Sequence, residues 1–146
     1  MFADWLLQRD KLNKLNLEHI LIADDDEDDV AMLLEAIKNY DSSVRFSVVS
    51  DGKQLIEYLD CGSEPDIIIL DLHMPCEDGK ECLKVIRSNE RYNAVPVIIY
   101  SAFSDPKEIS ECISYNLTYY IIKPLRLAEI VKLGEAIASG HLTSVY

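Results

Sequence analysis

The chain has 146 residues, enough for one domain with a hydrophobic core, and its apolar and charged fractions of 49% and 27% are ordinary for a globular protein. Its 26 acidic and 14 basic side chains give a net charge of −12 at pH 7, so we expect no direct contact with nucleic acid, which needs clustered Lys and Arg. The apolar runs are too short to span a bilayer and no secretory signal is visible, so we expect a cytoplasmic protein without membrane contact.

The cysteines show no pattern of a metal site or a disulfide framework. None of the four forms a CxxC pair, and no zinc-type spacing occurs among Cys61, Cys76, Cys82 and Cys112. In a reducing cytosol, free thiols are the expected state of such residues.

Residues 1–18 differ from the rest of the chain. The apolar side chains of this stretch that could share part of one helical face are Phe2, Trp5, Leu6, Leu12 and Leu15. We expect an extension that folds as a helix against its own domain or is partly disordered, and we leave homodimerisation through it and a non-native origin open. The domain itself is expected over residues 19–140, followed by a C-terminal tail at 141–146.

The first predicted strand is the apolar run His19–Ala23, and six acidic residues, Asp24–Asp29, follow it directly. Apolar residues then recur at the spacing of one helical face: Val30, Leu33, Leu34 and Ile37. The acidic first turn of this helix suits the positive end of the helix dipole. The alternating, β-rich segment 44–49 predicts an edge strand.

A central strand is predicted over residues 66–71, in which four consecutive aliphatic residues, Ile67–Leu70, indicate burial on both faces, as in a parallel sheet. A helix start is predicted on each side of this strand. Asp51 and Asp78 are the capping residues, and each is followed three positions later by a Gln or Glu that can bond back.

The C-terminal part repeats the same alternation. Residues 96–100 predict a fourth strand that ends at Ser101, and 105–108 combine a capping acid, a proline at the first helical position and a glutamate, which indicates a helix start. Residues 119–122 predict a fifth strand, which a lysine and a proline follow. A last amphipathic helix is expected to stop at Gly140.

Five strands that alternate with helices predict an α/β fold with a parallel sheet covered on both faces. The carboxyl ends of parallel strands share one edge of the sheet, where ligands bind in open α/β folds. The polar residues at these ends are Asp24, Asp25, Asp71, Ser101 and Lys123. Singly, each has a structural explanation, since an acid can cap a helix, a serine can end a turn and a lysine can be solvated. Their coincidence at one edge favours a functional site.

This set of residues suits phosphoryl transfer to a carboxylate. Asp71 could act as nucleophile and form an acyl phosphate, while Lys123 neutralises charge and the Ser101 hydroxyl bonds a phosphoryl oxygen. Gathered carboxylates repel one another, and Mg²⁺ relieves that repulsion because it binds carboxylates and phosphate oxygens. Asp25 and Asp71 would bind it directly, and Asp24 directly or through water.

Several ordered segments carry a family resemblance. They are ILIADD (20–25), IIILDLHMPCEDGKE (67–81), VPVIIYSA (95–102) and YIIKP (120–124). Over roughly residues 19–138 the chain resembles the receiver domain of two-component response regulators, in particular stand-alone receivers of the chemotaxis type. The resemblance implies a flavodoxin-like (βα)₅ three-layer sandwich with strand order 2-1-3-4-5.

The resemblance also implies the metal ligands. They would be Asp24, Asp25, Asp71 and the backbone carbonyl of His73. A metal-binding His73 ring is disfavoured, since Mg²⁺ prefers oxygen. An EF-hand within Asp24–Asp29 is disfavoured as well, because the central glycine and the terminal glutamate are missing.

The same resemblance makes Asp71 the phosphoacceptor, Lys123 the catalytic lysine, Ser101 the switch hydroxyl and Tyr120 the aromatic residue that moves with Ser101. It implies a cis Lys123–Pro124 peptide, which proline permits. Of the tyrosines at 115, 119 and 120, which could form a recognition stripe, 119 and 120 alternate across a strand, so we expect one of these two to face the core.

A phosphorylation-dependent signalling protein is therefore the function expected from the resemblance. A histidine kinase or phosphotransfer protein would donate the group, and the domain would catalyse only its own phosphorylation and dephosphorylation. An unidentified downstream protein would read the surface of the helix near Asp105, the fifth strand and the last helix. Phe103, two residues past Ser101, cannot orient water, so we expect slow dephosphorylation; His73 is the second residue expected to tune it.

Two other classes of protein share part of this pattern. Phosphatases that use an aspartate nucleophile carry an Asp-x-Asp motif after a strand. In this sequence position 73 is a histidine, and no cap domain is evident. A pseudo-receiver that acts only by protein binding is disfavoured because all five site positions are filled, although Ser101 stands where a threonine is commoner.

Overall fold

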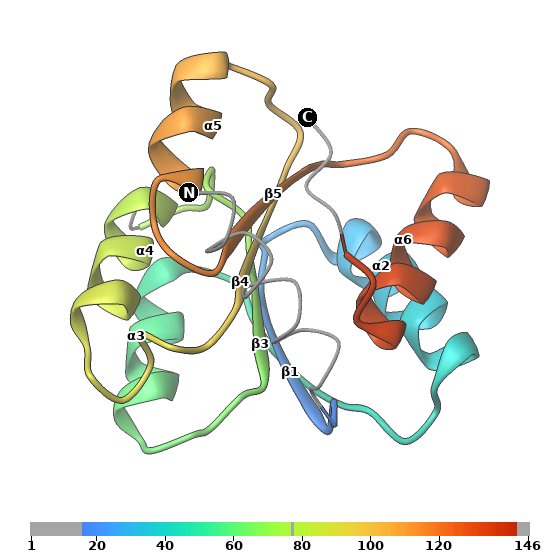
Figure 1. The fold of residues 1–146 in the computed structure, drawn as a ribbon, viewed down its shortest axis with the longest axis horizontal. Coiled ribbons are helices and arrows are strands. Elements are labelled where there is room, and N and C mark those ends of the chain that lie inside the picture. The colour runs from blue at the N-terminus through green and yellow to red at the C-terminus, as the bar shows by residue number, and fades with distance from the viewer. Residues whose placement is uncertain (1–15, 77, 143–146) are drawn as a thin grey trace.

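The computed structural model describes residues 16–76 and 78–142, and its centre is a parallel sheet (Figure 1). Its strands lie side by side in the order β2-β1-β3-β4-β5. The bounds of the strands are β1 His19–Ala23, β2 Arg45–Val49, β3 Ile67–Leu70, β4 Val97–Ser101 and β5 Thr118–Ile122. Every adjacent pair is parallel, which confirms the predicted flavodoxin-like order and places β2 at an edge.

Among the described residues, five helices cover the two faces of the sheet (Figure 1). Their bounds are α2 Glu27–Tyr40, α3 Gly52–Asp60, α4 Gly79–Ser88, α5 Pro106–Ile113 and α6 Leu127–Ser139. Helices α2 and α6 lie together on one face, and α3, α4 and α5 lie on the other. The result is the three-layer sandwich that the sequence predicts.

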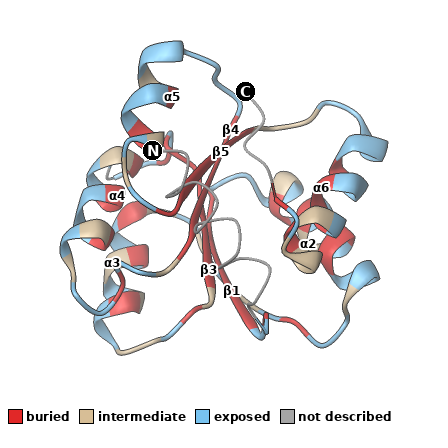
Figure 2. Ribbon diagram, in the orientation of Figure 1, coloured by how far each residue is buried: buried red, intermediate tan, exposed pale blue. Residues whose placement is uncertain are grey.

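Strands β1, β3, β4 and β5 are buried on both faces, as Figure 2 shows by their red colour between the partly exposed helices, whereas the edge strand β2 is partly exposed. Successive side chains of a strand point to opposite faces. In β1, Ile20 and Ile22 join the core beneath α2 and α6, and Leu21 joins the core beneath α3, α4 and α5. Because helices cover both faces, a strand here needs continuous apolar sequence rather than alternation.

The helix starts follow from local capping chemistry. Asp51, Asp78 and Asp105 each occupy the N-cap and accept a backbone N–H from the first turn, as predicted. Asp26 does the same for α2. Gly140 ends α6 in the left-handed conformation with φ 75°, which a glycine adopts without a steric penalty.

Two expectations from the sequence need correction. Every peptide bond among the described residues is trans, including Lys123–Pro124, so the expected cis bond is wrong here; the trans form of an X–Pro bond is intrinsically the more stable by about 0.5–1 kcal/mol. Both Tyr119 and Tyr120 are buried, rather than one of them, because each face of β5 carries a core cluster.

The terminal expectations lie mostly outside the described residues. Residues 1–15 and 143–146 are not described, so the expected N-terminal helix is not tested. Leu17 and Leu142 are both buried and belong to the core beneath α2 and α6. The four cysteines form no disulfide with one another, as expected, and no described helix is both long and apolar enough to cross a membrane.

Candidate functional site

Strand register brings the predicted polar residues to one edge of the sheet. Ala23 of β1 pairs with Leu70 of β3, and the backbone N–H of Asp71 donates to the carbonyl of Ala23 at 2.9 Å. Asp24 and Asp71 therefore leave neighbouring strands at the same level. On the other side, the backbone N–H of Lys123 donates to the carbonyl of Ser101 at 2.7 Å.

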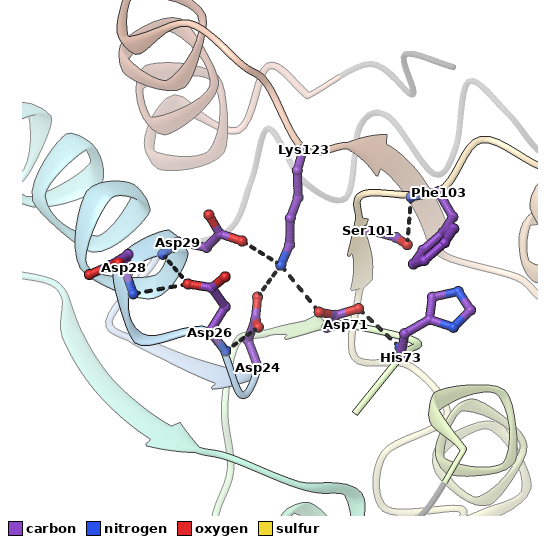
Figure 3. A network of polar contacts seen from close by, with 9 residues as sticks. All are labelled: Asp24, Asp26, Asp28, Asp29, Asp71, His73, Ser101, Phe103 and Lys123. Atoms are coloured by element: carbon purple, nitrogen blue, oxygen red, sulfur yellow. Dashed lines mark hydrogen bonds and ion pairs between the residues drawn. The ribbon is translucent and has the colours of Figure 1, made fainter. Parts of the chain in front are cut away.

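The side chain of Lys123 lies at the centre of this edge (Figure 3). Its ammonium nitrogen is 2.8 Å from Asp29 Oδ2, 2.9 Å from Asp24 Oδ2 and 3.2 Å from Asp71 Oδ2. Burial disfavours the charged ammonium, but the hydrogen bonds to Asp29 and Asp24 and the charge of Asp71 outweigh burial and raise the pKa of Lys123. Lys123 is thus a fixed positive charge that neutralises part of a strongly acidic site.

Asp24 is the most enclosed of the acids, with 4% of its surface exposed. Burial raises the pKa of Asp24 to about 6, against the opposing effects of the Asp26 backbone N–H and of Lys123; the charge of Asp71 adds to the increase. The Asp26 N–H donates to Asp24 Oδ1 at 2.9 Å and fixes the orientation of the carboxylate. A cation beside it would favour the ionised form.

Three carboxylates form a group suited to a hard cation. One oxygen each from Asp24, Asp25 and Asp71 lies within 4.8 Å of the other two. Asp25 is exposed, whereas the other two are buried. A cavity of about 570 Å³ opens beside this group, and its lining includes Asp25, Asp71, His73, Phe103 and Lys123. Oxygen donors at the border of an open cavity fit Mg²⁺, which keeps waters and phosphate oxygens among its ligands.

Both oxygens of Asp71 have a partner within the protein. Oδ2 faces Lys123, and Oδ1 accepts the backbone N–H of His73 at 3.0 Å. The ring of His73 points away from Asp24 and Asp71 (Figure 3). Its Nε2 lies 3.1 Å from Glu108 Oε1, and its ring centroid is 4.1 Å from that of Phe103.

The remaining predicted site residues are Ser101, at the end of β4, and Tyr120, in β5. Ser101 is fully buried, and its Oγ accepts the backbone N–H of Phe103 at 3.2 Å. The Tyr120 hydroxyl donates towards the carbonyl of Phe103 at 2.9 Å and towards Glu108 Oε1 at 3.2 Å. Burial raises the pKa of Tyr120 to about 12, although a hydrogen bond with Ser101 opposes the increase.

Two residues of this site are not predicted from the sequence. Asp29 contacts Lys123, and it was interpreted only as part of an acidic first turn; its place five residues after Asp24 on the first turn of α2 is the available signal. Glu108 was interpreted only as part of a helix start. Its contacts with His73 and Tyr120 join segments distant in sequence, which local patterns do not reveal.

Comparison with known proteins identifies the family. The model of the response regulator receiver domain matches residues 20–135. The two-component response regulator ORR11 of Oryza sativa subsp. indica is 32% identical over 117 residues, which cover 79% of this chain and 77% of the rice protein.

Solved structures give the same result. The phosphorylated cyanobacterial phytochrome response regulator RcpA superposes with a TM-score of 0.77 at 27% identity, over 83% of this chain and 91% of RcpA. The response regulator RPA3017, from red light signalling of R. palustris, gives a TM-score of 0.72 at 28% identity, over 83% and 91% of the two chains. With its acidic edge and its five-stranded order, this chain belongs to the family of response regulator receiver domains, the signalling domains of two-component systems.

Proposed function

We propose that this receiver accepts a phosphoryl group on Asp71 from a histidine kinase or a phosphotransfer protein. The observation that supports it best is the convergence of the Asp24, Asp25 and Asp71 carboxylates beside the ammonium of Lys123. Asp71 contacts Lys123 and accepts a backbone N–H from the following loop, as Asp24 also does, but Asp24 is not among the residues that line the open cavity. Asp71 lines this cavity, from which a donor can approach.

In the proposed step, a carboxylate oxygen of Asp71 attacks the phosphorus of a phosphohistidine on the partner. The new bond joins that oxygen to phosphorus, and the phosphorus–nitrogen bond breaks with its electron pair on the donor imidazole. The protein contributes positioning and fixed charge rather than a proton relay. Lys123 already faces Asp71 and needs little movement to meet an incoming phosphoryl oxygen.

The residues that would hold Mg²⁺ are Asp24, Asp25, Asp71 and the backbone carbonyl of His73. When bound, the ion supplies positive charge for the oxygens of the transferred group. Asp24 suits this role because its enclosed carboxylate is oriented by the Asp26 N–H. In the same proposal, Ser101 turns its hydroxyl to the phosphoryl group, and Tyr120 fills the space that Ser101 leaves.

We place the protein in the cytoplasm, where its free cysteines are expected to stay reduced. The signal would pass to a protein partner at the surface formed by α5, β5 and α6. This surface carries exposed apolar side chains at Leu125, Leu127 and Val131, which a partner can cover.

Incubation of the purified chain with a small phosphoryl donor such as acetyl phosphate, with and without Mg²⁺, tests the proposal. Intact-mass spectrometry should show one added phosphoryl group that depends on Mg²⁺. Asp71→Asn should abolish the addition, whereas Asp60→Asn, at the exposed end of α3, should not. Phosphate on the Asp71→Asn protein would contradict the assignment.

A further inference from the structure

Glu108 is an enclosed carboxylate that the proposed chemistry does not use. It lies in the first turn of α5, and only 12% of its side chain is exposed. Burial of a carboxylate is costly unless hydrogen bonds compensate. Two donors from distant parts of the chain meet at its Oε1: the hydroxyl of Tyr120 at 3.2 Å and Nε2 of His73 at 3.1 Å.

These contacts continue to the acceptor on one side and to the switch hydroxyl on the other. The backbone N–H of His73 donates to Asp71 Oδ1. The Tyr120 hydroxyl donates to the carbonyl of Phe103, and the N–H of Phe103 donates to Ser101 Oγ, so a series of contacts runs from Asp71 through His73, Glu108, Tyr120 and Phe103 to Ser101. Within this series, Glu108 is the residue that belongs to α5.

We propose that Glu108 is a positioning residue that holds Tyr120 buried and joins it, through His73, to the loop after Asp71. A change at the Asp71 carboxylate would shift the His73 N–H that it accepts, and the ring of His73 would carry that shift to Glu108. The first turn of α5 would then respond to the state of Asp71. This coupling rests on the proposed function, whereas the positioning of Tyr120 does not.

The carbonyl of Phe103 competes with Glu108 for the hydroxyl proton of Tyr120. The single hydroxyl proton of Tyr120 is shared between Glu108 and the carbonyl of Phe103, and Phe103 is 54% exposed on its loop. Among the described residues, the structure gives the Tyr120 hydroxyl these two acceptors as hydrogen-bond partners. Without Glu108, the orientation of Tyr120 would depend on an exposed loop.

Three variants separate the positioning role from a general effect on the helix. Glu108→Ala removes both contacts, whereas Glu108→Gln keeps an oxygen that accepts from Tyr120 and His73. Glu111→Ala is the matched control, because this exposed carboxylate lies three residues further along α5 and pairs with Lys80 at 3.6 Å.

The first measurement is ¹⁹F NMR of the full chain labelled with 3-fluorotyrosine, with the Tyr120 signal assigned from Tyr120→Phe. A soluble paramagnetic agent should leave this signal sharp in the wild type, in Glu111→Ala and largely in Glu108→Gln. In Glu108→Ala the exposed population of Tyr120 should rise about tenfold, as expected on loss of a charge-assisted hydrogen bond, and the signal should broaden. A Tyr120 signal as protected in Glu108→Ala as in the wild type would overturn the proposal.

The second measurement tests the coupling and keeps it separate from the proposed function. Amide shifts of α5 are recorded before and after phosphorylation by acetyl phosphate and are normalised to the phosphorylated fraction. Glu108→Ala should lose most of the α5 response, and Glu111→Ala should keep it. An undiminished response in Glu108→Ala would overturn the coupling, whereas a wild-type chain that takes up no phosphate would overturn the proposed function and leave the ¹⁹F result valid.

Discussion

The ammonium of Lys123 lies 3.2 Å from Oδ2 of Asp71, while the backbone N–H of His73 donates to Oδ1 of the same carboxylate at 3.0 Å. One oxygen is thus held by a residue that follows β5, and the other by a residue that follows β3. These contacts set the orientation of the Asp71 carboxylate before a phosphoryl donor binds (Figure 3). Reactions that depend on alignment gain most from such fixed geometry.

Lys123→Met should destabilise the fold by about 3 kcal/mol, because it leaves Asp24, Asp29 and Asp71 without their common cation. Added Mg²⁺ should recover more stability in this variant than in the wild type, since a bound cation replaces part of the lost charge. Urea unfolding with and without Mg²⁺ measures both effects. The control is Lys53→Met, an exposed lysine in an i,i+4 pair, which should change stability by no more than about 0.5 kcal/mol. Equal effects of the two substitutions would contradict the role of Lys123.

Gly79→Ala should damage the site through the backbone. A Cβ at this position would lie 2.5 Å from Leu72 Cα and 2.7 Å from the Asp71 carbonyl oxygen, so the segment that carries the acceptor must shift. We expect a loss of about 1–3 kcal/mol and slower phosphorylation per folded molecule. Gly134→Ala is the control: its Cβ would lie 2.6 Å from Ala36 Cβ at the contact of α2 with α6, far from the chemistry. It should lower stability with little change in phosphorylation, and equal rates in the two variants would count against this account.

His19 should make stability depend on pH. Burial lowers the pKa of His19 from 6.5, the charge of Arg45 lowers it further, and Asp66 opposes them. As the pH falls, His19 therefore takes up a proton in the unfolded chain before it does so in the folded protein. Above a pH of about 6.5, His19 has no effect on the free energy of unfolding. Below that pH the free energy of unfolding falls, until the pH has passed the pKa of His19 in the folded protein. The groups that face the ring are Ser47, Tyr58, Arg45 and Asp66.

Urea unfolding on both sides of that pH measures the effect. His19→Gln should reduce the loss of stability at low pH, whereas His141→Gln, at an exposed position, should leave it unchanged. If the wild type and His19→Gln lose equal stability on acidification, burial of the imidazole is not the cause.

The local signals of the sequence were sufficient to predict the individual strands and helix starts. Apolar runs between caps predicted each strand, and Asp51, Asp78 and Asp105 cap the helices as expected because capping involves residues only two or three positions apart. Strand order required the family resemblance, since the apolar character of a strand buried on both faces does not specify its neighbours.

The site was predicted less completely. The ends of the strands can be predicted from the sequence, so Asp71 and Lys123 were expected at the same edge of the sheet. The structure brings them into contact. Asp29 and Glu108 were missed because their partners lie far away in the chain, and a first-turn acid has a sufficient local explanation in the helix dipole. The isomer of the Lys123–Pro124 bond was predicted wrongly, since the two forms differ by little free energy and tertiary context decides between them.

Phe103→Glu should accelerate loss of the phosphoryl group. The exposed Phe103 ring lies against the ring of His73 beside the cavity that Asp71 lines, and it offers no group that orients a water. A carboxylate there can bond such a water, and we expect about a tenfold faster dephosphorylation, equivalent to a barrier lower by about 1.4 kcal/mol. Decay of purified phosphoprotein after removal of the donor gives the rate. Phe103→Leu is the control and should decay as slowly as the wild type; an unchanged rate in Phe103→Glu would refute the shielding role.

The most direct test of the central claim is to locate the phosphoryl group. Reduction of the phosphorylated chain with borohydride converts an acyl phosphate of aspartate to homoserine, and peptide mass spectrometry then identifies the modified position. The account predicts homoserine at position 71 after treatment with acetyl phosphate and Mg²⁺. Homoserine at position 24, 25 or 29 with Asp71 intact would contradict it.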